Sequence, residues 1–292
     1  MTSSADRAGA SGPRAVLTRS APPPDLVLRY GDGPDQVADI RLPPCGPSED
    51  ARQMTAAAPL VMFLHGGFWR AEWDRSHTGP LAAALAAVGF VVCVPEFRRV
   101  ESRSPGGWPA TFDDVATAVD TLPGMVAAAV HGADPAWVVL AGHSAGGHLA
   151  LWAAARHRLP IGTPWRTAGP QPVHAVVGLA PVSDLTACHE EGLGDDAAAA
   201  LLGGGPAQVP GRYAATDPAR LLPLGVPVRL VHGVDDDRVP VRMSRVFTAR
   251  AGAAGDDVVL RNVPDCEHFG LIDPLSPAWR HVLAAFAEAA RL

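Results

Sequence analysis

A serine between two glycines is the residue of this sequence with the clearest capacity for chemistry. Ser144 lies in Gly142-His143-Ser144-Ala145-Gly146, directly after an apolar run typical of a strand and directly before an Ala-rich run typical of a helix. A G-x-S-x-G turn in this context exposes the serine hydroxyl as a nucleophile above a sheet edge. The amide of Ala145, at the start of the helix, is then a donor to a developing oxyanion. The alternative is a Gly-rich strand-to-helix turn that only happens to contain serine.

A second motif, His65-Gly66-Gly67-Phe68-Trp69, follows another apolar run. Glycine permits backbone dihedrals that other residues resist, so the amides of Gly67 and Phe68 are predicted to face the same oxyanion. His65 is expected to brace this loop through hydrogen bonds rather than to act as a base. Taken alone, the glycines indicate no more than a turn, and their pairing with the serine motif favours the functional interpretation.

A serine hydroxyl is a weak nucleophile, so it needs a general base and an acid that orients the base. In the architecture of which this serine turn is typical, the chain order is Ser, Asp, His. His268 is the predicted base, because it follows the last expected strand. His232 and His281 are rivals, but the first precedes the acid and the second falls inside the expected C-terminal helix.

The predicted acid lies among three consecutive aspartates that follow another expected strand. Asp236 fits a G-x-x-D-x-x-V-P spacing, whereas Asp235 and Asp237 are ranked behind it as turn or capping residues. An aspartate in a turn usually serves only the turn. Here the preceding strand, the following helix and the His268 loop favour an orienting role, but the choice among the three rests on motif spacing.

Several aromatic side chains fall in or beside the proposed site loops. They are predicted to line a substrate pocket, although core packing is an equal alternative for each of them. These residues are Trp69, Trp73, Trp108 and Phe269. His189-Glu190-Glu191 lacks the second histidine of a zinc-protease helix, so no metal and no cofactor are predicted.

The elements that must position these residues alternate between short β-rich runs and longer helical runs, which predicts an α/β fold with a mostly parallel sheet flanked by helices. Strands are expected at residues 60–64, 90–94, 137–141, 173–179, 226–232 and 258–263, after an antiparallel hairpin at 25–30 and 37–42. Helices are expected at residues 79–88, 110–122, 145–157, 240–251 and 277–292. Residues 183–218 break the alternation and are predicted to form a lid-like excursion over the carboxyl edge of the sheet.

Composition bounds the remaining possibilities. The 292 residues are 48% hydrophobic and 18% charged, which fits a single domain over residues 25–292 behind a disordered tail at 1–24. The net charge of −6 without a basic block argues against a nucleic-acid partner. All 24 basic residues are arginine, which excludes lysine-dependent chemistry. Four widely spaced cysteines and the absence of a signal-peptide core or membrane span predict a cytoplasmic protein with free thiols.

With HGGFW, GHSAGGH, GVDDDRVP and EHFGLIDP present in order, the chain resembles the α/β-hydrolase superfamily over residues 59–292. It is most similar to the kynurenine formamidase (arylformamidase) and small esterase branch, although Gly147 stands where alanine is more typical. The resemblance implies Ser144 as nucleophile, His268 as base and Asp236 as acid. It also implies oxyanion donors, namely the amides of Gly67, Phe68 and Ala145.

The expected activity is therefore hydrolysis of a small carboxylic ester or an aryl formamide through an acyl-enzyme, with a small-molecule ester or amide as the only expected partner. A small peptidase of the prolyl-oligopeptidase type is an alternative. A catalytically inactive hydrolase fold used as a binding module is another. The sequence leaves open the acyl and leaving groups, the physiological pathway, the oligomeric state and the mobility of residues 183–218.

Overall fold

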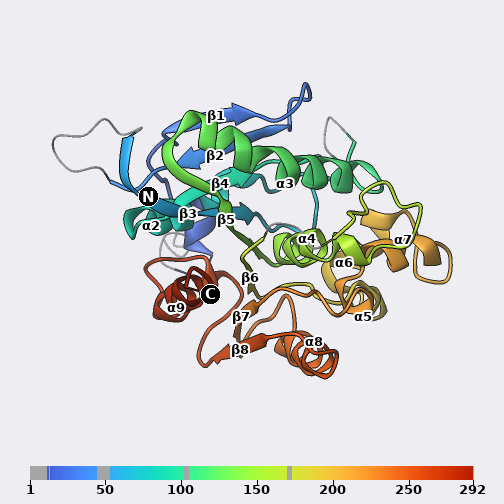
Figure 1. The fold of residues 1–292 in the computed structure, drawn as a ribbon. Coiled ribbons are helices and arrows are strands. Elements are labelled where there is room, and N and C mark those ends of the chain that lie inside the picture. The colour runs from blue at the N-terminus through green and yellow to red at the C-terminus, as the bar shows by residue number, and fades with distance from the viewer. Residues whose placement is uncertain (1–11, 13, 45–52, 102–104, 170–172, 292) are drawn as a thin grey trace, which may run out of the picture.

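A computed structural model describes residues 12, 14–44, 53–101, 105–169 and 173–291, and in this part of the chain eight strands form one sheet. The strand order is β1-β2-β4-β3-β5-β6-β7-β8 (Figure 1). Strand β2 pairs antiparallel with β1 and β4, and the remaining pairs are parallel. The strands are β1 (Leu26–Arg29), β2 (Val37–Arg41), β3 (Gln53–Leu64), β4 (Val91–Pro95), β5 (His131–His143), β6 (Ala175–Leu179), β7 (Val228–Gly233) and β8 (Val258–Val263).

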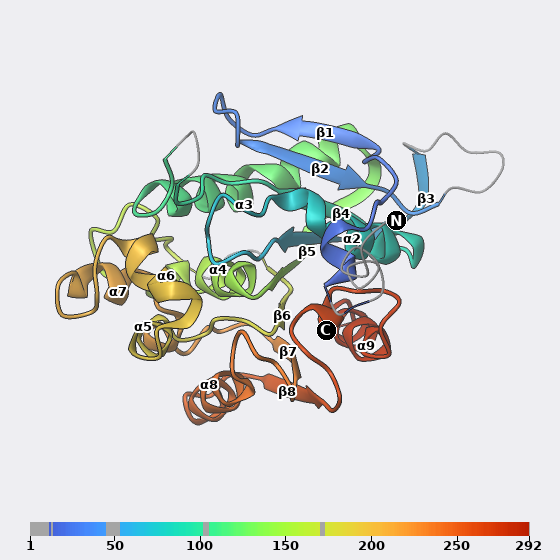
Figure 2. The same ribbon diagram turned by 180° about the vertical axis from the view of Figure 1, so that it is seen from behind.

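Helices cover both faces of the sheet. Figures 1 and 2 show α2 and α9 on one face and α3, α4 and α8 on the other, with α5, α6 and α7 grouped beyond α4. Their bounds are α2 (Gly79–Ala87), α3 (Ala110–Ala129), α4 (Ala145–Ala154), α5 (Leu185–Glu190), α6 (Leu193–Leu202), α7 (Pro210–Thr216), α8 (Val241–Ala253) and α9 (Trp279–Ala289). This layering is the α/β-hydrolase arrangement that the motifs predicted.

The central strands are apolar because helices bury them on both sides. Every residue of β4, β6 and β7 is buried. Along β5 the side chains alternate between two apolar clusters: Val138 and Leu140 join the cluster under α3 and α4, whereas Val139 and Ala141 join the cluster under α2 and α9. The period of two therefore directs consecutive side chains to opposite faces of the sheet.

Each expected strand and helix has a counterpart in the structure, with differences at the ends. Strands β3 and β5 begin earlier than expected, at Gln53 and His131. Helix α3 continues through Pro123 to Ala129, because Val126 beyond the proline is fully buried in the core. The excursion at residues 183–218 contains three short helices rather than one, α5, α6 and α7.

The prediction of a disordered tail over residues 1–24 is wrong for residues 14–24, and for residues 1–11 and 13 it lies outside the described part of the chain. Residues Ala15–Thr18 form the short 3-10 helix η1, and Val16 is fully buried in the apolar cluster that also contains residues of α2 and α9. The Arg19 guanidinium donates hydrogen bonds to both carboxylate oxygens of Asp273. Burial of an apolar side chain and a paired charge order this segment, and the charge pairing has no local signal in the sequence.

Three further observations concern the described residues only. The thiols of Cys93, Cys188 and Cys266 are free, whereas Cys45 lies outside the described part of the chain. No described helix combines the length and apolar character that crossing a bilayer requires. No group of three or more His, Cys, Asp or Glu side chains within that part of the chain is arranged to hold a metal ion.

Candidate active site

Ser144 lies at the junction of β5 and α4 in a strained conformation. Its φ of 56° and ψ of −119° are rarely adopted by a residue with a side chain. The two neighbouring glycines make the turn possible. A Cβ on Gly146 would lie 2.0 Å from the Leu64 carbonyl oxygen, and one on Gly142 would lie 2.2 Å from the Gly146 oxygen. The packing of β5 against α4 and β3 thus requires both glycines.

The loop after β3 has an unusual backbone conformation. Gly67, Phe68 and Trp69 all have positive φ, at 113°, 49° and 57°. Within the described residues, the amides of Gly67, Phe68 and Ala145 donate to no other group of the protein. Amides left free in this way are available to a ligand oxygen. They are the three amides that the sequence predicted to face an oxyanion.

His65 and Glu96 form hydrogen bonds that support the loop after β3. The His65 ring places Nδ1 2.9 Å from the Gly66 carbonyl oxygen and Nε2 2.8 Å from Glu96 Oε1, and it stacks on Phe97. Burial alone would raise the pKa of Glu96, but His65 and the Arg99 guanidinium outweigh it and lower that pKa. The side chain of His65 therefore serves the loop, in agreement with its expected role.

His268 and Asp236 form a close pair. His268 Nδ1 lies 2.6 Å from Asp236 Oδ2, and the other oxygen of Asp236 accepts hydrogen bonds from the amides of Arg238 and Val239, both at 2.8 Å. Burial opposes the charge on Asp236, but hydrogen bonds from His232 and His268 hold the pKa of this carboxyl well below its usual range. Asp236 is thus an anion that fixes the orientation of the His268 ring.

The structure separates this pair from its rivals. Asp235 and Asp237 are exposed beside Asp236. His232 is fully buried, with Nδ1 2.7 Å from the Ser244 hydroxyl and Nε2 2.8 Å from the Val239 carbonyl oxygen. Its Nε2 also lies 3.4 Å from Asp236 Oδ2, so His232 supports the acid from within the protein. His281 lies on α9, outside the residues that line the site.

One cavity of about 710 Å³ brings together four of the six predicted catalytic and oxyanion residues, whereas Asp236 and Ala145 do not line it. Ser144, His268, Gly67 and Phe68 all line it, at the carboxyl edge of the sheet. Of the aromatic side chains predicted for the pocket, Trp73 and Phe269 line the cavity. The lining combines apolar side chains with the nucleophile and base candidates and with charged residues at Arg14, Arg70 and Arg238.

Trp69 and Trp108 are corrections to that prediction, because neither lines the cavity. Trp69 is 1% exposed and packs edge-on against His148 in the core. Trp108 packs edge-on against Trp165. The spacing of aromatic residues in the sequence does not distinguish a side chain that turns into the core from one that turns toward the cavity.

Other lining residues were not predicted individually. They include Arg14, Leu17 and Thr18 from the N-terminal segment and His77 from the turn before α2. Gly194 and Asp195 of α6 also line the cavity, so the excursion at residues 183–218 reaches the site. The apolar pair Val16 and Leu17 inside the polar N-terminus was the sequence signal that could have revealed the lining residues of the N-terminal segment.

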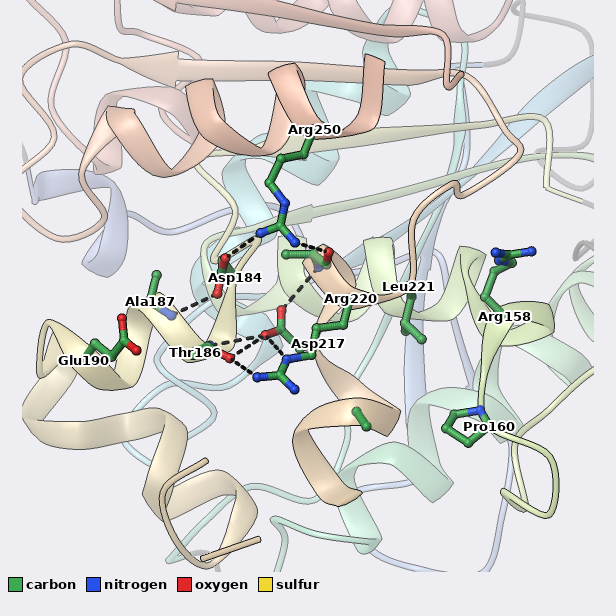
Figure 3. A pocket seen from close by; sticks show the side chains of 12 residues that line it. Arg158, Pro160, Asp184, Thr186, Ala187, Glu190, Asp217, Arg220, Leu221 and Arg250 are labelled. Atoms are coloured by element: carbon green, nitrogen blue, oxygen red, sulfur yellow. Dashed lines mark hydrogen bonds and ion pairs between the residues drawn. The ribbon is translucent and has the colours of Figure 1, made fainter. Parts of the chain in front are cut away.

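A second large hollow, of about 800 Å³, lies beside α5 and η4 (Pro218–Arg220) (Figure 3). Its charged side chains are largely bonded to one another. Arg250 pairs with Asp184 at 3.2 Å, and Asp217 accepts from the Thr186 hydroxyl at 2.9 Å. This mutual pairing marks the hollow as structural, and neither Ser144 nor His268 lines it.

Comparison with known proteins relates this geometry to hydrolases. The family model BD-FAE matches residues 50–250. Esterase LipQ of Mycobacterium tuberculosis is 28% identical over 216 residues, which make up 72% of this chain and 50% of that protein. The chain thus spans about half the length of this relative.

Solved structures share the fold at lower identity. A truncated carbohydrate esterase from gut microbiota superposes with a TM-score of 0.74 at 20% identity, covering 94% of this chain and all of that one (100%). Esterase B from Lactobacillus Rhamnosis superposes with a TM-score of 0.72 at 21% identity, covering 98% of this chain and 93% of that one. The predicted α/β-hydrolase fold is confirmed.

Proposed function

The chain belongs to the BD-FAE family and has the α/β-hydrolase fold, and from this premise we propose that it is a serine hydrolase of small carboxylic esters. One observation carries the proposal: strained Ser144, His268 in its pair with Asp236, and Gly67 and Phe68 with their free amides come together, and Ser144, His268, Gly67 and Phe68 border the same cavity. Because each part is needed for acyl transfer, their convergence favours an enzyme over a binding module.

In this mechanism the Ser144 hydroxyl attacks the ester carbonyl carbon while His268 Nε2 accepts its proton. The negative charge on the carbonyl oxygen is stabilised by the amides of Gly67, Phe68 and Ala145. Asp236 stabilises the imidazolium that forms. His268 then returns the proton to the departing alkoxide, which leaves as an alcohol and yields an acyl-enzyme.

Hydrolysis of the acyl-enzyme repeats these steps with water. His268 removes a proton from the water molecule that attacks the acyl carbon, and the same amides hold the oxyanion. Collapse of this second intermediate breaks the bond to Ser144 Oγ, which recovers its proton from His268. The products are a carboxylic acid and the regenerated enzyme, and no metal or organic cofactor takes part.

The test compares the wild-type protein with Ser144→Ala on a p-nitrophenyl acyl series and on N-formylkynurenine. We expect the wild type to hydrolyse short esters and the variant to lose roughly 10⁵-fold or more of kcat, as removal of a triad nucleophile does. Labelling by a fluorophosphonate should likewise depend on Ser144. A variant with near-wild-type hydrolysis would refute the assignment.

Comparing the p-nitrophenyl esters with N-formylkynurenine distinguishes ester hydrolysis from formamide hydrolysis. The esterase names of LipQ and the two structural neighbours support the ester. A much higher kcat/KM on N-formylkynurenine would instead make the protein an arylformamidase. Folded wild-type protein that neither reacts with the probe nor hydrolyses any substrate would favour the inactive binding module.

A further inference from the structure

The N-terminal segment of residues 14–24, here termed the N-terminal strap, forms one wall of the candidate active site. Arg14, Leu17 and Thr18 of the strap line the cavity that contains Ser144. Val16, beside Leu17 in the chain, is fully buried in the apolar cluster under α2 and α9, and the partly buried Leu17 packs against the same cluster. The buried Val16 side chain fixes the position of η1 on the fold and thereby places Leu17 at the cavity.

Two polar contacts anchor the strap to the rest of the fold. The Arg19 guanidinium pairs with Asp273, with Nη2 3.0 Å from Oδ2 and the side chains 29% and 15% exposed. The Pro23 carbonyl oxygen accepts from Arg41 Nη1 at 3.3 Å. A bidentate arginine–carboxylate pair has a defined geometry, so Arg19 fixes the strap near the loop that follows His268.

The strap also separates two hollows. A third cavity, of about 390 Å³, lies on the other side of the strap and is lined by strap residues together with Asp39, Arg41 and Arg75. Leu17, Thr18 and His77 line both this cavity and the active-site cavity. Leu17, Thr18 and His77 therefore lie between the two cavities, and we expect a smaller or displaced side chain at Leu17 to open a passage between them.

The contacts of Arg14 place the strap on the leaving-group side of the site. The Arg14 guanidinium lies 5.7 Å from the centre of the Phe269 ring, and that ring lies 5.2 Å from the ring of His268. His268 must donate its proton to the oxygen of the departing alcohol, so the alcohol portion of an ester lies on the His268 side. The strap and Phe269 together border that portion.

Building on the ester hydrolysis proposed above, we propose that the N-terminal strap sets the size limit for the alcohol portion of the substrate. Leu17 provides the apolar limit, and the pair of Arg19 with Asp273 holds it in place. Esters of small alcohols fit within the partitioned cavity, whereas bulky alcohols need the space beyond Leu17.

The experiment varies one half of the ester at a time. Acetate esters of alcohols of increasing size report on the alcohol portion, and p-nitrophenyl esters of increasing acyl length report on the acyl portion. The variants are Leu17→Ala, Leu17→Trp and Arg19→Gln. Arg261→Gln is the matched control, because Arg261 also pairs with a carboxylate, that of Glu288, but lies away from the cavity.

We expect Leu17→Ala and Arg19→Gln to raise kcat/KM for bulky alcohols about 10-fold relative to small ones, the discrimination that a few methylene groups in a pocket provide. Leu17→Trp should lower that ratio, and Arg261→Gln should leave it unchanged. The acyl-length profile should be the same in every variant. Because Leu17 is only partly buried, its substitution is compatible with folding.

The outcomes distinguish this proposal from the one on which it rests. Active variants with unchanged alcohol profiles, or changes confined to the acyl series, would overturn the role of the strap and leave ester hydrolysis intact. A wild-type protein that hydrolyses none of the esters would overturn both.

Discussion

The ring of His143 lies 4.4 Å from the ring of His268, and its Nε2 lies 3.1 Å from the His268 carbonyl oxygen. A carbonyl oxygen only accepts, so Nε2 carries the proton and donates. Burial and the neighbouring His268 lower the pKa of His143 well below its usual range. A neutral His143 can therefore hold the backbone of His268 without placing a second positive charge beside the imidazolium that forms during catalysis.

Replacement of His143 by phenylalanine tests this positioning role. Phe keeps a flat ring against His268 but cannot donate to its carbonyl oxygen. We expect kcat to fall about tenfold with little change in KM, which corresponds to the loss of one hydrogen bond. Steady-state kinetics check the prediction, with His281→Phe on α9 as the control. An equal fall in both variants, or a change in KM alone, would argue against it.

Asp236→Asn should reduce kcat about 10⁴-fold, because an amide no longer stabilises the imidazolium and selects the wrong tautomer of the base. The neighbouring Asp237→Asn is a matched control, since Asp237 is exposed and makes no contact with His268 among the described residues. Measuring kcat of both variants on a p-nitrophenyl ester would decide whether Asp236 or Asp237 is the acid. If Asp237→Asn had the larger effect, the acid would have been misidentified.

Two glycine substitutions should change stability in opposite directions. Gly146→Ala drives a Cβ to 2.0 Å from the Leu64 carbonyl oxygen, and since backbone cannot yield easily we expect a loss of at least about 3 kcal/mol in the free energy of unfolding. Gly124→Ala places its Cβ in open space within α3 and should add about 0.5–1 kcal/mol. Chemical denaturation measures both, and the same sign in each would contradict this account.

Asp217 should make stability depend on pH. Burial, and then the charge of Asp184, raise its pKa to about 6. A raised pKa in the folded state means that its contribution to stability is greatest below the unfolded pKa of about 3.9 and declines as pH rises through about 6.

The difference in unfolding free energy between wild type and Asp217→Asn should therefore fall by roughly 2 kcal/mol between pH 4 and pH 7. Urea unfolding across this range gives that difference. Asp32→Asn, at an exposed turn, is the control and should show little trend. A difference that grew with pH would have the wrong sign.

The sequence predicted those parts of the site that depend on local geometry. The turn at Ser144 needs glycines at fixed neighbouring positions, so the motif itself reveals it. Asp236 was separable from Asp235 and Asp237 by spacing, and the structure places its carboxylate against His268. In each case a short backbone conformation and the chain order determine where the side chain lies.

Features that depend on contacts distant in the sequence were not predictable. Trp69 and Trp108 are aromatic residues near the site in sequence, yet the direction of each side chain depends on packing against helices far along the chain. The order in residues 14–24 depends on Asp273, a partner separated by 254 positions from Arg19. Helix α3 continues past Pro123 because Val126 is buried, which no local pattern indicates.

The bond between Arg19 and Asp273 also bears on how the protein folds. The two residues are separated by 254 positions, so Val16 and Leu17 lack this anchor until a segment far along the chain has reached them. Contacts between residues far apart in the sequence close large loops and form slowly. Closure of the cavity wall beside Ser144 is consequently a late step of folding.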